Sequence, residues 1–263
     1  MISRESDTEG FMLKTQRFMA AILCFSLMIC ALFGAEETNS SQDTEKKPSR
    51  QIANTFTKAV LVQFTYEYLT ALPPDYEQKE KWPLVLFLHG SGECGSNLSK
   101  VKANGPPKIA ETTPYPFILI SPQSPEDHWD THGLNALLDE VVSKYKVDID
   151  RVYVTGLSLG GGATWAMCAA YPERFAAAVP VCGWNPNPKT AELIKNIPFW
   201  VFHGEADKTV PIQHSKRMVD ALKKAGADPK FTTYPGVDHA SWVKAYAEPE
   251  LWTWLLSQKR GVK

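Results

Sequence analysis

The sequence has few cysteines and no excess of charge of either sign, and both features exclude classes of protein. Its 263 residues include five cysteines, and 28 lysines and arginines nearly balance 29 aspartates and glutamates. Small domains held together by disulfides carry a much higher share of cysteine, so the chain is not a disulfide scaffold. A protein that neutralises phosphates along nucleic acid needs a basic excess. We therefore expect no nucleic-acid partner.

Three cysteines lie beyond the first 35 residues, and an odd number allows at most one disulfide between them. Cys168 lies in an apolar helical pattern and Cys182 ends an apolar run, so both are expected to be small buried thiols. Cys94 lies in a glycine-rich segment, and whether it is free stays open. Cysteine and histidine form no cluster with the spacing of a metal site, so we expect no metal and no cofactor.

The N-terminal region lacks the composition of a folded domain. Lys14 and Arg17 precede an apolar run over residues 18–33, which a polar stretch follows. This layout is typical of a signal peptide over residues 1–35, which predicts a secreted or periplasmic protein with no integral membrane role after cleavage. An uncleaved membrane anchor is the alternative, although the run is short for a bilayer. Polar residues 36–50 are expected to form a disordered linker, and residues 51–263 one domain.

Apolar runs alternate with helical patterns through the rest of the chain. Strands are expected at residues 59–68, 83–88, 117–120, 152–155, 175–181, 199–202 and 231–234. Helices are expected at residues 133–145, 163–171, 191–194, 212–224 and 242–256, and a long loop at 90–107. Most of the strands are apolar on both faces, which is typical of a parallel sheet that helices cover. The alternation therefore predicts an α/β fold, with a mostly parallel doubly wound sheet and helices on both faces.

The stretch around Ser158 carries the strongest single motif. Gly156, Ser158 and Gly160 form the pattern G-x-S-x-G between an apolar run and a helical pattern. That context is typical of a nucleophile elbow, a sharp turn that lifts a serine hydroxyl above the end of a sheet. Glycines suit the turn because side chains beside the serine would collide with neighbouring elements. A plain glycine-rich turn from strand to helix is the alternative.

A serine hydroxyl is a weak nucleophile and needs a general base, which a carboxylate must orient. His239 is the best candidate for the base, because it follows the last expected strand after a proline–glycine turn. His89 and His203 each end an inner strand and precede a glycine. Histidines in that position more often pack and hydrogen-bond at the rim of the sheet. The three other histidines, His128, His132 and His214, carry no positional signal.

Asp207 is the candidate for the orienting acid, because it follows closely on the end of an expected strand. The chain order Ser158, Asp207, His239 is the order of an α/β-hydrolase. Asp238 is a rival, but it neighbours His239, and adjacent side chains point apart. Its alternative role is that of a turn carboxylate. Glu205 is a weaker rival.

The oxyanion that forms on attack needs backbone N–H donors. Leu159 directly follows the serine at the start of a helix and is expected to supply one N–H group. Ser91, in the glycine-rich loop after the strand at 83–88, is expected to supply the second. In the same loop Gly90, Gly92 and Gly95 spell the dinucleotide pattern G-x-G-x-x-G. No clean helical pattern follows it, so nucleotide binding is not expected.

Six segments together resemble the α/β-hydrolase superfamily. Within it they are similar to secreted esterases of the phospholipase/carboxylesterase and dienelactone-hydrolase-like group, and to polyhydroxybutyrate depolymerases and feruloyl esterases. The segments span residues 86–93, 120–123, 154–161, 170–176, 202–207 and 234–239. The resemblance implies an α/β-hydrolase fold, a catalytic triad of Ser158, Asp207 and His239, and oxyanion donors at Ser91 and Leu159.

The chain departs from these relatives in two places. Many relatives carry methionine where this chain has Leu159, which changes little because only its N–H group is needed. Relatives often carry an arginine where this chain has Cys94, so a cation that could meet an anionic substrate is missing. No inserted lid is evident between residues 181 and 199. The open cleft expected from this leaves Trp184 either as a platform for a substrate ring or as a packing residue.

These patterns predict a serine esterase that acts on a small-molecule or polymer-derived carboxylic ester through an acyl-enzyme. A prolyl-oligopeptidase-type peptidase is the alternative within enzymes, although such peptidases usually carry a large gating domain. A non-catalytic binding protein of the same fold is the alternative outside them. Labelling by a fluorophosphonate separates an activated serine from that last alternative.

Overall fold

The computed structural model describes residues 55–59, 61–185 and 187–261. The expected signal peptide at 1–35 and linker at 36–50 lie outside the described residues. The described residues 55–59 form no helix or strand, and the elements below all lie between residues 61 and 261. None of the helices in these ranges is long and apolar enough to cross a membrane.

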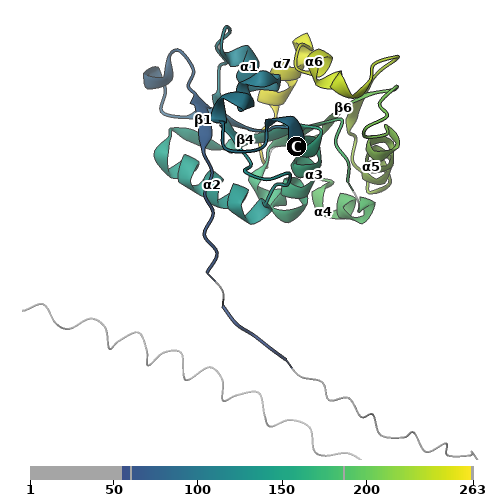
Figure 1. The fold of residues 1–263 in the computed structure, drawn as a ribbon, viewed down its shortest axis with the longest axis horizontal. Helices are drawn as coiled ribbons and strands as arrows, with labels where there is room; N and C mark the ends of the chain where they lie inside the picture. The colour runs from purple at the N-terminus through teal and green to yellow at the C-terminus, as the bar shows by residue number, and fades with distance from the viewer. Residues whose placement is uncertain (1–54, 60, 186, 262–263) are drawn as a thin grey trace, which may run out of the picture. The chain divides into compact units, whose positions relative to one another are not determined.

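The described residues from 61 onward form one open sheet of seven strands (Figure 1). The strands are β1 (Tyr68–Ala71), β2 (Trp82–Leu88), β3 (Ile118–Pro122), β4 (Val147–Leu157), β5 (Ala177–Val181), β6 (Trp200–Gly204) and β7 (Lys230–Tyr234). Their order across the sheet is β1-β3-β2-β4-β5-β6-β7, and only the edge strand β1 is antiparallel to its neighbour. Parallel neighbours end at the same edge of the sheet, so the turns after β2, β4, β6 and β7 share one rim.

Helices cover both faces of the sheet. They are α1 (Gly105–Ala110), α2 (Thr131–Lys144), α3 (Leu159–Ala170), α4 (Ala191–Ile194), α5 (Gln213–Lys224), α6 (Trp242–Ala245) and α7 (Pro249–Ser257). Alternate residues of β2 point to opposite faces, with Leu84, Leu86 and Leu88 in one core cluster and Val85 and Phe87 in the other. The first cluster includes residues of α2 to α5, and the second includes residues of α6 and α7. The predicted mostly parallel sheet with helices on both faces is confirmed.

Three expected elements were placed wrongly. The first strand lies at Tyr68–Ala71 instead of residues 59–68, because its pairing partner β3 reaches that segment only. The expected closing helix at 242–256 is two helices, since Pro249 has no N–H group to donate and its ring clashes with the preceding turn. The expected loop at 90–107 contains short 3₁₀ turns and the start of α1, where Pro106 and Pro107 occupy first-turn positions.

Candidate active site

Ser158 lies at the turn between β4 and α3, in a backbone conformation that few residues adopt. Its φ is +53° and its ψ is −115°, and its N–H group donates to the carbonyl of Val181 at 3.0 Å. A Cβ atom at position 160 would lie 1.9 Å from the carbonyl oxygen of Leu88, and one at position 156 would lie 2.3 Å from that of Gly160. The two glycines are therefore required by close backbone approach, and the expected elbow is the turn that results.

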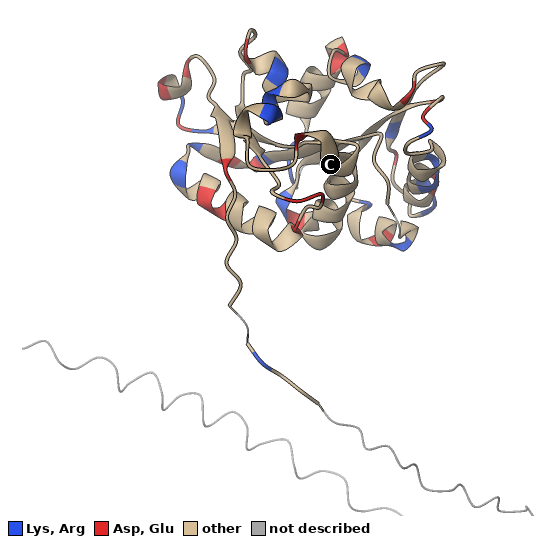
Figure 2. Ribbon diagram, viewed as in Figure 1, with Lys and Arg blue, Asp and Glu red and all other residues tan. Residues whose placement is uncertain are grey.

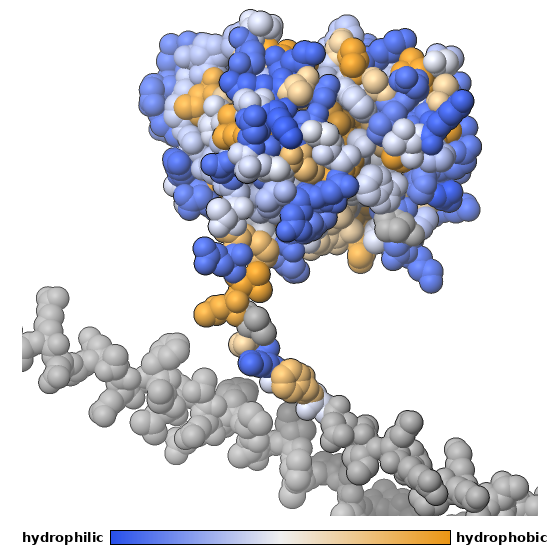
Figure 3. Space-filling view, viewed as in Figure 1, coloured by the Kyte–Doolittle hydropathy of each residue, from blue (hydrophilic) through white to orange (hydrophobic). Residues whose placement is uncertain are grey.

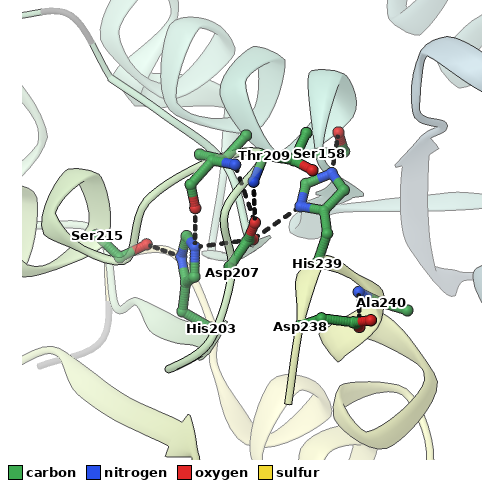
Figure 4. Close-up of polar contacts among 9 residues, drawn as sticks. Ser158, His203, Asp207, Thr209, Ser215, Asp238, His239 and Ala240 are labelled. Carbon is green, nitrogen blue, oxygen red and sulfur yellow. Dashed lines mark hydrogen bonds and ion pairs between the residues drawn. The ribbon is translucent and has the colours of Figure 1, made fainter. Parts of the chain in front are cut away.

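His239 and Asp207 come to Ser158 from two other strand ends. His239 follows β7, and its Nε2 atom lies 2.8 Å from Ser158 Oγ. Its Nδ1 atom lies 2.7 Å from Asp207 Oδ2, after β6 (Figure 4). A carboxylate only accepts, so Nδ1 donates to Asp207, which leaves Nε2 to accept the serine hydroxyl proton. The three side chains thus form one line of hydrogen bonds in the order that a triad needs.

The Asp207 carboxylate is buried and saturated with donors. Its Oδ1 atom accepts the N–H groups of Thr209 and Val210, both at 2.9 Å. These two backbone donors fix the carboxylate plane, so that Oδ2 faces His239 (Figure 4). Burying a carboxylate without such donors would cost several kcal/mol.

The two rival carboxylates lie elsewhere. Asp238 is exposed, and its side chain accepts the N–H group of Ala240 at 3.0 Å, which makes it a turn carboxylate. Glu205 is exposed and accepts the hydroxyl proton of Thr233 at 2.7 Å. Figure 2 shows acidic residues scattered over the ribbon, so the presence of a carboxylate does not by itself mark a functional site.

A cavity of about 310 Å³ opens beside Ser158. Ser91 and Leu159, the expected oxyanion donors, both line it, and so does Trp184. The remaining lining residues are Asp127, Thr209, Val210 and His214. The cavity is about the size of a small ligand site and has both polar and apolar walls.

His89 fixes the direction of the Ser91 N–H group. Its Nε2 atom accepts the N–H group of Ser124 at 3.0 Å, so its proton resides on Nδ1, which donates to the carbonyl of Gly90 at 2.6 Å. In a trans peptide the carbonyl and the following N–H group point in opposite directions. Holding the carbonyl of Gly90 therefore turns the N–H group of Ser91 away from His89. Burial lowers the pKa of His89, which keeps the imidazole neutral.

His203 touches the Asp207 carboxylate from the side opposite His239. Its Nε2 atom lies 3.2 Å from Asp207 Oδ2 and 2.8 Å from the carbonyl of Val210, and its Nδ1 atom lies 2.7 Å from Ser215 Oγ. Burial lowers the pKa of His203 below its usual value. Rim packing is the usual role of a histidine at such a strand end, and no sequence pattern indicates its contact with Asp207.

Several wall residues escaped sequence reasoning. Asp127 lines the cavity from the loop after β3, Thr209 from the loop after β6 and His214 from the start of α5, and no motif marks them. Two tryptophans hold rim loops together: Trp129 donates to the carbonyl of His89 at 3.3 Å, and Trp242 donates to Asn104 Oδ1 at 3.1 Å.

One group in the described part of the chain has metal-ligand geometry. Candidate ligand atoms of Cys182, Asp207 and His239 lie within 4.8 Å of one another. The three residues are far apart in sequence, so spacing could not reveal them. An ion bound there would have to replace the 2.7 Å hydrogen bond between Asp207 and His239. The arrangement therefore fits a hydrogen-bonded triad better than a metal centre.

Comparisons with known proteins agree with this fold. Residues 121–249 match the model of the dienelactone hydrolase family. The chain is 27% identical to an uncharacterised secreted protein of Arthroderma benhamiae over 245 residues, which cover 74% of this chain and 26% of that protein. It is 34% identical to feruloyl esterase B of Neurospora crassa over 116 residues, 38% of each chain. The chain thus spans less than two thirds of the length of these two relatives.

Solved structures of esterases share this fold. A thermostable esterase is 34% identical with a TM-score of 0.63, over 73% of this chain and 59% of that one. Esterase PE8, at 18% identity and a TM-score of 0.53 over 71% of this chain and 97% of that one, shares the fold. Residues 121–249 thus match the dienelactone hydrolase family of the α/β-hydrolase superfamily, and the mostly parallel open sheet agrees with the fold of these esterases.

Proposed function

We propose that the protein is a serine hydrolase that cleaves carboxylic esters through a covalent acyl-enzyme. The observation that carries the proposal is the unbroken line of hydrogen bonds from Asp207 through His239 to Ser158, at 2.7 and 2.8 Å, beside an open cavity. Relatives named esterase support the chemistry.

In the first half of the reaction, His239 Nε2 takes the proton of Ser158 as Oγ attacks the acyl carbon. The N–H groups of Leu159 and Ser91 stabilise the oxyanion, and the start of α3 adds its dipole there. The orientation of the Gly90–Ser91 peptide by His89 supports the role of Ser91. Asp207 holds the tautomer of His239 and stabilises its cation. His239 then protonates the leaving alcohol.

In the second half, His239 removes a proton from water, which attacks the acyl-enzyme, and Ser158 recovers its proton as the acid leaves. Trp184 stands in the cavity wall, where its ring can contact the acyl or the alcohol group. The substrate is a small-molecule or polymer-derived ester, and the reaction uses no cofactor. We also propose that the protein is secreted or periplasmic, which the N-terminal pattern and the secreted relative support.

Replacement of the nucleophile tests the proposal. The variant Ser158→Ala should lose at least about 10³-fold in kcat on p-nitrophenyl butyrate, because no other group can form the acyl-enzyme. The variant should also no longer react with a fluorophosphonate probe. Ser143→Ala is the matched control, since Ser143 is exposed on α2 and bonds only to the carbonyl of Glu140. Turnover near the wild-type rate in Ser158→Ala would refute the mechanism.

A further inference from the structure

Two imidazoles lie close to the same oxygen atom of Asp207. His239 Nδ1 lies 2.7 Å from Oδ2 and His203 Nε2 lies 3.2 Å from it (Figure 4). Among the described residues, no lysine or arginine forms an ion pair with this carboxylate. Its charge is therefore balanced by backbone N–H groups and by the two histidines.

The partners of His203 determine which nitrogen carries its proton. The carbonyl of Val210 can only accept, so Nε2 is protonated and its hydrogen lies between that carbonyl, at 2.8 Å, and Asp207 Oδ2. Nδ1 is then the acceptor of the Ser215 hydroxyl at 2.7 Å, from α5. The side chain is fully buried, and burial lowers its pKa, so the neutral form donates to the Val210 carbonyl and keeps its Nε2–H group beside Asp207.

A donor at Oδ2 has a chemical effect on His239. Each hydrogen bond that a carboxylate accepts withdraws some of its negative charge, so it attracts the proton of the other partner less strongly. With His203 in place, Asp207 holds the His239 cation less tightly, and the carboxylate cannot rotate away from His239. Losing His203 would free Oδ2 on one side and change both effects at once.

We infer that His203 is a positioning residue for ester hydrolysis: by placing its Nε2–H group 3.2 Å from Asp207 Oδ2, it fixes the carboxylate against His239 and moderates how strongly Asp207 holds the proton of His239. The inference rests on the proposed function. The alternative is that His203 only fills space between β6 and α5, in which case the identity of its donor atom would not matter.

The groups that face the two histidines come from several elements of the fold. His239 faces Asp207 from the loop after β6, Ser158 from the elbow, Cys182 from the end of β5 and the ring of Trp242 from α6, at 5.4 Å between centroids. Burial raises the pKa of the Cys182 thiol to about 12, so it stays neutral. His203 faces the Val210 carbonyl and Ser215. Among these facing groups, Asp207 and the histidines are therefore the ones that can carry charge.

Two substitutions at His203 separate the donor from the bulk. The amide nitrogen of glutamine extends as far as Nε2 of histidine, so His203→Gln can still donate to Asp207. The amide of asparagine ends near the position of Nδ1, so His203→Asn reaches Ser215 but not Asp207. We expect kcat on p-nitrophenyl butyrate to fall about 10- to 100-fold in His203→Asn, the range for losing one hydrogen bond to a charged group. KM should change less than about twofold, and His203→Gln should retain most of the rate.

The pH dependence of kcat/KM is the readout that a space-filling role would not move. In His203→Asn the acid limb should shift to higher pH, because Asp207 then holds the His239 proton more strongly. It should stay near the wild-type position in His203→Gln. Equal losses in both variants, or an unmoved acid limb in His203→Asn, would overturn the inference.

Controls keep the outcomes apart. If His203→Asn does not fold, as judged by circular dichroism, the pair His203→Gln and His203→Met gives the same comparison, because methionine fills space without a donor. His132→Asn and His132→Gln should leave the profile unchanged, since His132 is exposed on α2 and bonds to Tyr171. A wild-type protein that neither cleaves the ester nor reacts with a fluorophosphonate would contradict the proposed function itself. An active wild type with no difference between the His203 variants would contradict only this inference.

Discussion

The dipeptide His-Gly occurs at the ends of two parallel strands, and the histidines of these two strand ends donate from opposite nitrogen atoms. His89 follows the last residue of β2 and donates from Nδ1 to the carbonyl of Gly90, while Nε2 accepts from Ser124. His203 lies in β6 and donates from Nε2, while Nδ1 accepts from Ser215. Both are buried, and burial lowers the pKa of each.

The difference between the two copies shows that the neighbours of a histidine, and not its sequence context, set its tautomer. A backbone N–H group forces Nε2 of His89 to accept, and a backbone carbonyl forces Nε2 of His203 to donate. One ring therefore orients the peptide that carries the Ser91 N–H group, and the other orients the carboxylate of Asp207. The first ring thus acts on the proposed oxyanion donor, and the second acts on the proposed acid of the triad.

The largest effect expected from this comparison is at His89, where asparagine should preserve kcat better than glutamine, the reverse of the order expected at His203. His89→Asn keeps a donor near Nδ1 and should retain most of kcat, whereas His89→Gln loses the bond to Gly90 and frees the Ser91 peptide. Removing one oxyanion donor costs about 10²- to 10³-fold in kcat, which is the upper bound for His89→Gln. Rates on p-nitrophenyl butyrate measure both.

The reversal itself is the critical observation. At position 203 glutamine should be tolerated better than asparagine, and at position 89 asparagine better than glutamine. The same order at both positions would show that the two histidines are held by their bulk and not by their tautomers.

A smaller effect is expected on stability in acid. Both histidines are kept neutral in the folded protein, whereas in the unfolded chain they titrate near the usual value of about 6.5. The unfolded state therefore binds more protons below that value. The stabilisation is complete above about pH 6.5 and is lost as the pH falls toward the lowered values, at up to about 1.4 kcal/mol per pH unit for each histidine.

Urea unfolding between pH 7 and pH 5 measures this loss. His203→Gln and His89→Asn should each make the free energy of unfolding less dependent on pH over that range, while His132→Gln should not. Unchanged slopes in the first two variants would mean that the buried rings can be protonated without penalty.

The smallest effect is expected at the remaining partner of His203. Ser215→Ala removes the hydroxyl that donates to Nδ1, but the Val210 carbonyl still holds the proton on Nε2. We expect a loss of about twofold in kcat and of about 1 kcal/mol in the free energy of unfolding. A loss as large as that of His203→Asn would show that Ser215, and not Val210, determines the tautomer.

Much of this molecule could be predicted from its sequence because local patterns carried the information. Continuous apolar runs marked the inner strands, and the elbow glycines marked Ser158. The position of β1 could not be predicted, since its register depends on pairing with β3. The break before α7 is marked in the sequence by Pro249, and the expected single helix at 242–256 did not take that signal into account.

The contacts of the site were harder to foresee than its members. His203 contacts Asp207, four residues later in the chain, and Val210, seven residues later. Both contacts depend on the turn that the chain makes after β6. The cavity wall combines Asp127 and Thr209 from two loops with His214 from α5. Three-dimensional placement alone joins such residues, and no short motif records it.

The hydropathy of the surface is mixed, with no single apolar face dominating the view in Figure 3. The cavity beside Ser158 is likewise mixed, and its wall has a particular consequence for evolution. Asp127, Trp184 and His214 stand on segments that lie outside the backbone contacts of the elbow, where Gly156 and Gly160 leave no space for a side chain. Substrate preference can therefore drift through these wall positions while the reaction chemistry is inherited unchanged.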